Sequence, residues 1–168
     1  MSTKSKTIIA GIALMICIAR TATAQDLSFT ALGGQTVTTS SMRGKVTVLL
    51  FSGVQDPQCR DGAKALETLA DRFRGKPVQI YLVSVNSPAE ASNDQLKSAF
   101  GATSSVLVLR DGTQAAFKKF SGKRAQLPTV VVLDAQGNAS GQPRGGFNPN
   151  TDFVNDLASI IDGLLANK

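Results

Sequence analysis

Cys59 and Asp56 are the residues of this chain best suited to chemistry. The sequence contains two cysteines, Cys17 and Cys59, and no histidine. Without histidine the chain lacks the commonest general base and the commonest metal ligand. A cysteine thiolate can attack a disulfide, but the mixed disulfide that forms needs a second thiol to resolve it. The first hypothesis is therefore thiol chemistry at Cys59, with Asp56 as its acid or base.

The segment from Asp56 to Cys59 also has the pattern of a helix start. Asp is favoured at the N-cap of a helix, and Pro, here Pro57, is favoured at the next position. The Asp56 carboxylate is then expected to accept hydrogen bonds from the amides near Gln58 and Cys59. A helix N-terminus lowers the pKa of a thiol, whereas burial and the Asp56 charge raise the pKa of Cys59. The residues alone leave a structural role and a reactive role open for both side chains.

The first residues of the chain have the three-part layout of a secretory leader. Two early lysines precede an apolar run of 12 residues, Ile8–Ala19, and Ala-Thr-Ala follows at 22–24. Small residues at these positions predict cleavage between Ala24 and Gln25. The alternative is a membrane anchor, but a spanning helix needs about 20 apolar residues. We therefore expect residues 1–24 to be a signal peptide, and the protein to be periplasmic or secreted.

Removal of the leader changes what the composition implies. Fifteen basic and twelve acidic residues would remain, a net charge of +3, which is too small to indicate nucleic-acid binding. Cys17 would be lost, so Cys59 could not form an intramolecular disulfide. Because Ile16 rather than a small residue precedes Cys17, we do not expect a lipid-modified cysteine. The mature chain is expected to have no membrane anchor.

The remaining residues, 25–168, show alternating strand and helix patterns without a linker. This order predicts one α/β domain with a mixed central sheet of about five strands between layers of helices. The final helix is expected over about Thr151–Leu165. In chain order, the elements expected before it are a hairpin (27–30 and 35–38), a strand (45–52), a helix (59–73), a strand (78–85), a helix (92–100), a strand (106–109), a helix (113–120) and a strand (129–133) turning into 138–142.

Several segments together resemble the thioredoxin superfamily. They are the Gly44–Phe51 strand, the Asp56–Arg60 helix start and Leu127-Pro128-Thr129 before a strand. The resemblance is closest to exported TlpA/ResA-like thiol-disulfide oxidoreductases, which share the redoxin (AhpC/TSA) domain, and it extends from Leu27 to the C-terminus. It implies a three-layer thioredoxin-like fold. It also implies a cis peptide bond before Pro128, which the sequence alone would leave trans.

The same resemblance exposes departures from the family motif, which is W-C-x-x-C-R. Alignment on Phe51 and Arg60 places Asp56 on the first, attacking cysteine and Cys59 on the second. Gln55 stands in place of the tryptophan. The resemblance therefore implies a degenerate active site with no thiol pair.

Two acidic positions of the family are also changed. Gly62 stands where TlpA/ResA-like proteins carry an acid, and Leu50 stands at the buried acid of ordinary thioredoxins. Since the second cysteine is the more buried one in the family, the resemblance implies a neutral thiol at Cys59. The attacking thiol and both candidate proton-transfer groups are thus missing together.

A peptide groove is the other feature that the resemblance implies. In the family, the loop at the cis-proline pairs through its backbone with an extended substrate, and a glycine such as Gly146 lies at the rim; a plain turn at 145–146 is the alternative. Lys118, Lys119, Lys123 and Arg124 precede this loop and form either a solvated surface or an attraction for acidic partners. The expected groove residues are Pro57, Gln58, Leu127, Pro128, Thr129 and Gly146.

Three functions remain. We expect a binding module for an extended peptide or protein, with little or no dithiol-disulfide exchange and no cofactor or metal. The alternative is a single-cysteine oxidoreductase or peroxidase that uses Cys59 and Asp56. Redoxin-type peroxidases carry P-x-x-x-T-x-x-C, whereas Ser52 and Asp56 occupy the proline and threonine positions here. An adhesive or structural role is the third, and no residue pattern favours it.

Overall fold

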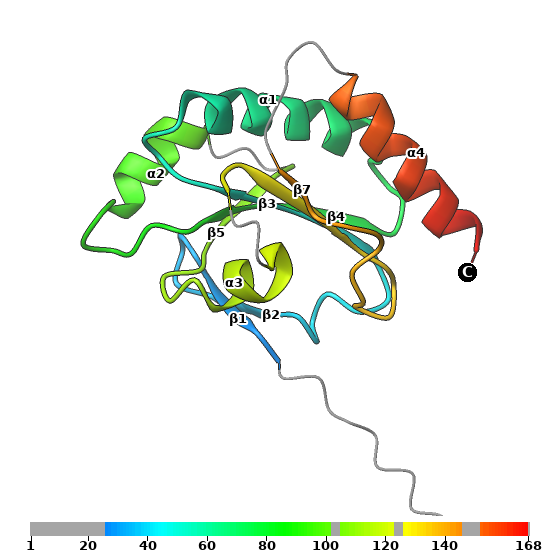
Figure 1. The fold of residues 1–168 in the computed structure, drawn as a ribbon, viewed down its shortest axis with the longest axis horizontal. Coiled ribbons are helices and arrows are strands. Elements are labelled where there is room, and N and C mark those ends of the chain that lie inside the picture. Colours follow the sequence, from blue (N-terminus) through cyan, green and yellow to red (C-terminus); the bar gives the residue numbers. More distant parts are fainter. Residues whose placement is uncertain (1–25, 102–104, 123–125, 146–151, 168) are drawn as a thin grey trace, which may run out of the picture.

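The computed structural model describes residues 26–101, 105–122, 126–145 and 152–167. They form a mixed seven-stranded sheet in the order β2-β1-β5-β4-β3-β6-β7, with four helices (Figure 1). The elements are β1 (Ser28–Ala31), β2 (Thr36–Thr38), β3 (Val46–Ser52), α1 (Pro57–Arg72), β4 (Val78–Ser84), α2 (Asn93–Phe100), β5 (Leu107–Arg110), α3 (Ala115–Ser121), β6 (Thr129–Leu133), β7 (Arg144–Gly145) and α4 (Phe153–Ala166).

Strand β3 is the centre of the sheet. All seven of its residues are buried, because it pairs with parallel β4 on one side and with antiparallel β6 on the other. The continuous run of β-branched and apolar residues in its sequence is typical of a strand covered on both faces. Helix α1 begins directly beyond the carboxyl end of β3, so the central strand positions the Asp56–Cys59 segment.

The two faces of the sheet are covered differently. Helices α1, α2 and α4 lie on one face, and α3 lies on the other (Figure 1). Each face has its own hydrophobic core. The first contains Leu50, Cys59 and Leu66, and the second contains Leu49, Phe51 and Phe117. The three-layer α/β architecture predicted from the sequence is therefore confirmed.

Two expectations about the sheet were wrong. About five strands were expected, but the hairpin β1–β2 joins the sheet through antiparallel pairing of β1 with β5, and β7 adds a seventh strand. Residues 138–142 do not return as a strand. Only Ala139 forms an isolated bridge, to Leu133. Gly141, with φ of +76°, and Pro143, which has no N–H to donate, delay regular pairing until Arg144.

The described helices are all too short or too polar to span a membrane. The expected leader, residues 1–24, lies outside the described residues.

Candidate functional site

The start of α1 has the predicted helix cap. Asp56 has an extended backbone, with φ of −92° and ψ of 118°, and Pro57 opens the helix. The Asp56 Oδ1 accepts a hydrogen bond from the Gln58 amide at 2.9 Å, and the Asp56 carbonyl accepts one from the Cys59 amide at 3.1 Å. The Asp56 side chain therefore satisfies an amide that the first helical turn would leave without a partner.

The Cys59 thiol lies in the core rather than at the surface. Its residue is 0% exposed, and its Sγ accepts a hydrogen bond from the Gly53 amide at 3.3 Å. Burial raises the pKa of the thiol, and the Asp56 charge raises it further. The Ser52 hydroxyl and the Gly53 amide lower the pKa, although the buried Ser52 Oγ makes no hydrogen bond of normal geometry within the described residues. The geometry thus favours the neutral thiol, which is a poor nucleophile.

Gly62 and Leu50 contact each other beneath the first turns of α1. Gly62 is buried, and a Cβ atom added to it would lie 3.1 Å from Leu50 Cδ2. Leu50 itself is 1% exposed. These are the two positions at which the resemblance places acidic residues. Here they form a close apolar contact between helix and sheet, which supplies no group for proton transfer, and a side chain at 62 would require Leu50 to shift.

The Leu127–Pro128 loop lies beside the start of α1. The peptide bond between the two residues is cis, and Pro128 is buried. A Cβ atom on Gly53 would be 3.4 Å from Leu127 Cδ1, so Leu127 packs against the residue whose amide binds Cys59. Two segments about 70 residues apart in the sequence are thereby brought together.

Gly145 lies close to the Gln126 side chain at the end of this loop. It pairs with Thr129, whose hydroxyl donates to the Gln126 carbonyl. A Cβ atom on Gly145 would lie 2.6 Å from Gln126 Nε2, so a side chain there would displace the Gln126 amide. Sequence reasoning assigned the rim glycine to Gly146, which lies outside the described residues.

Two cavities flank the site. One of about 600 Å³ adjoins the cis-proline loop, where Gln126, Thr129 and Gly145 line it. The other, of about 550 Å³, lies between α1 and α2, with Pro57 at its edge. Pro57 and Gln58, in the first turn of α1, are exposed. In the described parts of the chain, no three Cys, Asp or Glu side chains gather to hold a metal ion.

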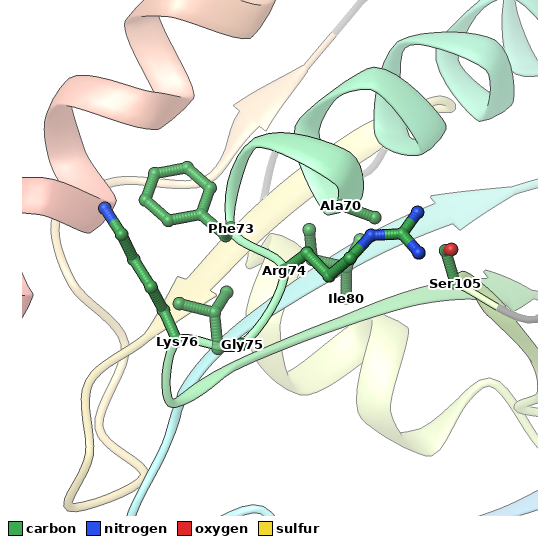
Figure 2. Close-up of a pocket in the computed structure, with 8 residues that line it drawn as sticks. Ala70, Phe73, Arg74, Gly75, Lys76, Ile80 and Ser105 are labelled. Carbon is green, nitrogen blue, oxygen red and sulfur yellow. The ribbon is translucent and has the colours of Figure 1, made fainter.

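A third cavity lies far from Cys59, at the opposite end of α1. It has a volume of about 300 Å³. Figure 2 shows Arg74 reaching toward Ser105 across an apolar floor, while Lys76 extends toward Phe73. The Lys76 ammonium lies 5.0 Å from the Phe73 ring centre and 3.6 Å from Asp162. Arg74 pairs with Asp71, as Lys76 does with Asp162, and no candidate residue lines this cavity, so we exclude it from the site.

Asn86 and Arg110 support the site and were missed by sequence reasoning. Asn86 Oδ1 accepts from the Val54 amide at 3.0 Å, in the loop just before Asp56. The Asn86 carbonyl accepts from Arg110 Nη1 at 2.7 Å, and Arg110 is only 8% exposed. Across the described ranges, no carboxylate lies within 4 Å of this guanidinium. The sequence did contain a signal for these two residues. Asn86 follows the apolar strand β4, and Arg110 ends the neighbouring strand β5.

Comparisons with known proteins identify the family of the chain and its fold. A sequence model of the AhpC/TSA family matches residues 21–140. No curated protein sequence matches the chain.

Several solved structures have the same fold. A protein from Chlorobium tepidum, provisionally assigned as thiol:disulfide interchange protein DsbE, is 20% identical, with a TM-score of 0.69 over 83% of this chain and 93% of that chain. The exposed lipoprotein thioredoxin Etrx1 of Streptococcus pneumoniae is 17% identical, with a TM-score of 0.66 over 82% and 98%. A secreted disulfide oxidoreductase of Mycobacterium tuberculosis is 18% identical, with a TM-score of 0.63 over 84% and 96%. At these identities the likeness establishes a thioredoxin-like fold.

Proposed function

This chain belongs to the AhpC/TSA family, and from that premise we propose that it is a peptide- or protein-binding member that has lost dithiol-disulfide exchange. The observation that carries the proposal is the burial of Cys59 beside the apolar Gly62–Leu50 contact. Exchange needs an accessible thiolate, a resolving thiol and a route for the proton. Each of these three requirements is opposed by a residue at this site.

A different residue opposes each of the three requirements for exchange. Asp56 stands where the family motif places the attacking thiol, and its carboxylate is engaged as a helix cap. Cys59 is enclosed and its pKa is raised, so the thiolate is disfavoured. Leu50 fills the space next to Gly62. The same features argue against a peroxidase that uses Cys59, because such an enzyme also needs an exposed thiolate.

Features that suit binding are retained. The cis-proline loop packs against Gly53, just before α1, and Pro57 and Gln58 in the first turn of α1 are exposed. The cavity of about 600 Å³ beside Thr129 and Gly145 is large enough to take side chains of a bound segment. An extended peptide can pair with backbone at such a loop and place alternate side chains in neighbouring cavities.

We place this activity outside the cytoplasm. The leader-like pattern of residues 1–24 supports export. Structures of similar fold include a secreted disulfide oxidoreductase and an exposed lipoprotein thioredoxin. Sequencing the N-terminus of the exported protein tests the location, and a mature chain that retains Met1 would contradict it.

Thiol labelling tests the loss of exchange. We expect a disulfide-exchanging dye to react slowly with the native protein and rapidly in guanidinium chloride, because Cys59 is enclosed. Cys59→Ala supplies the matched background, including any signal from Cys17. Rapid native labelling together with consumption of hydrogen peroxide would overturn the proposal in favour of a single-cysteine enzyme.

A further inference from the structure

The loop between β3 and α1 is bound by side chains from two other parts of the chain. The Gly53 amide donates to Cys59 Sγ at 3.3 Å, and the Val54 amide donates to Asn86 Oδ1 at 3.0 Å. Asn86 follows β4, and its Oδ1 would lie 3.8 Å from a Cβ atom on Gly53. Two consecutive amides of the loop therefore each have a side-chain acceptor, one from α1 and one from beyond β4.

Asn86 is itself fixed by its neighbours. Its amide donates to Ser84 Oγ at 3.2 Å, and its carbonyl accepts from Arg110 Nη1 at 2.7 Å. Arg110 Nη2 also donates to the Ala91 carbonyl and to Asn93 Oδ1, both at 2.9 Å. Because the guanidinium donates in several fixed directions, one buried arginine connects the segment after β4, the end of β5 and the start of α2. These contacts hold the backbone that carries the Asn86 side chain.

The other hydrogen bonds of the loop are weaker than the bond to Asn86. A thiol sulfur is a weak acceptor, so Cys59 Sγ contributes little to holding the Gly53 amide. The Asp56 amide donates to the Gly53 carbonyl at 3.3 Å, which is longer than the usual N–H···O distance. The Val54–Asn86 bond, at 3.0 Å, has normal length. We therefore expect Asn86 to contribute most to the position of the loop.

We infer that Asn86, held by Arg110, is a positioning residue that keeps the Gly53–Val54 backbone closed against Cys59. The inference rests on the proposed function, because it identifies what maintains the enclosed thiol on which that function depends. Without the Asn86 acceptor, the Val54 amide needs water as its partner, and the loop opens locally while the sheet stays folded. Because Leu127 packs against Gly53, the same bond also supports the cis-proline loop.

The rate of Cys59 labelling in low concentrations of urea tests this inference. The probe is the disulfide-exchanging dye, and the Cys59→Ala background of each variant is subtracted. A thiol exposed by a small local opening is labelled at a rate that barely changes with urea, whereas exposure by global unfolding rises steeply. We expect Asn86→Ala to speed native labelling about ten- to a hundredfold, with a shallow urea dependence. Asn86→Asp keeps the acceptor oxygen and should be labelled as slowly as the unaltered protein.

Asp152→Ala is the matched control. It removes the side-chain cap of α4 and so lowers the global stability without removing a contact of the loop. Its labelling rate should keep a steep urea dependence. Arg110→Lys keeps the charge but cannot donate to all three oxygens in the same geometry, so it should open the loop by a smaller factor than Asn86→Ala. This variant supplies the comparison if Asn86→Ala does not fold.

Three results would overturn the inference. Equal labelling rates and urea slopes in Asn86→Ala and Asp152→Ala would show that Asn86 contributes only to global stability, and the proposed function would stand. Labelling of Asn86→Asp as fast as that of Asn86→Ala would show that the acceptor oxygen does not hold the loop, and again the proposed function would stand. Rapid labelling of the unaltered protein would contradict the proposed function itself, and with it the closed loop.

Discussion

The two faces of the sheet differ in how completely the chain satisfies its own groups. On the face covered by α1, α2 and α4, each helix has a side-chain cap, from Asp56, Ser92 and Asp152 respectively. Basic residues near the end of α1 form ion pairs, among them Lys76 with Asp162. The other face has one seven-residue helix, α3, which begins at Gln114 in a left-handed conformation and without a cap from that side chain.

We expect this difference to appear in how much each face contributes to the stability of the fold. On the face with three helices, Gly62 of α1 and Leu50 of β3 are in close contact. The α3 face has two cavities, of about 600 and 310 Å³. The following predictions test this contrast, beginning with the largest effect.

Gly62→Glu should be the most damaging single change on the face with three helices. The new Cβ would lie 3.1 Å from Leu50 Cδ2, and a carboxylate would be buried without a partner. We expect a loss of about 3–5 kcal/mol in the free energy of unfolding, measured by urea denaturation. Lys64→Glu, at an exposed position of the same helix, should stay within about 0.5 kcal/mol. Equal losses for the two variants would show that this face is not closely packed at Gly62.

Asp111→Ala should weaken the α3 face selectively. Asp111 is 2% exposed, and its Oδ2 accepts from the Phe117 amide at 2.8 Å, which provides α3 with a cap from outside the helix. Its loss leaves a buried amide without a partner and should cost about 1–3 kcal/mol. Hydrogen exchange should quicken in α3 before it quickens in α1. Asp111→Asn keeps an acceptor oxygen and should cost less; if the two variants lose the same stability, the cap is not the reason.

Asp56→Ala should remove the cap of α1 and cost about 0.5–2 kcal/mol, measured by thermal or chemical unfolding. Asp56→Ser and Asp56→Asn keep an acceptor for the Gln58 amide and should be tolerated. If Asp56 were instead an acid or base for Cys59, Asp56→Asn would fold well yet abolish a measurable thiol reaction. That result would contradict the structural role of Asp56.

The smallest effect is expected from pH at the edge of the α3 face. The Ser40 hydroxyl, followed by the Thr39 hydroxyl and the Ser40 amide, lowers the pKa of Asp26 from its usual 3.8 to about 2. Because the carboxylate is favoured in the folded state, its contribution is present above pH 3.8 and is lost as the pH falls toward 2. Melting curves between pH 2 and 5 should show this loss, and Asp26→Asn should reduce it. An unchanged slope in Asp26→Asn would show that other carboxylates account for the acid sensitivity.

The sequence predicted features that depend on neighbours in the chain. Asp56-Pro57 indicated the helix start, and the run from Val46 to Ser52 indicated the buried strand. The site depends instead on contacts between distant segments. Nothing local to Gly145 signals that Gln126 lies 2.6 Å from its Cβ position, and nothing local to Arg110 signals its bond to the Asn86 carbonyl. The cis bond before Pro128 was expected only from a family resemblance, because local sequence favours trans.

The contact between Gly62 and Leu50 also constrains how this protein can evolve. An acidic side chain at 62 meets Leu50 unless position 50 becomes smaller first, and a smaller residue at 50 leaves a cavity while Gly62 is present. Each single step toward an acidic site therefore passes through a less stable protein. The effect of a substitution at either position therefore depends on the residue at the other. Selection for stability alone is expected to keep both positions apolar, even if Asp56 is replaced.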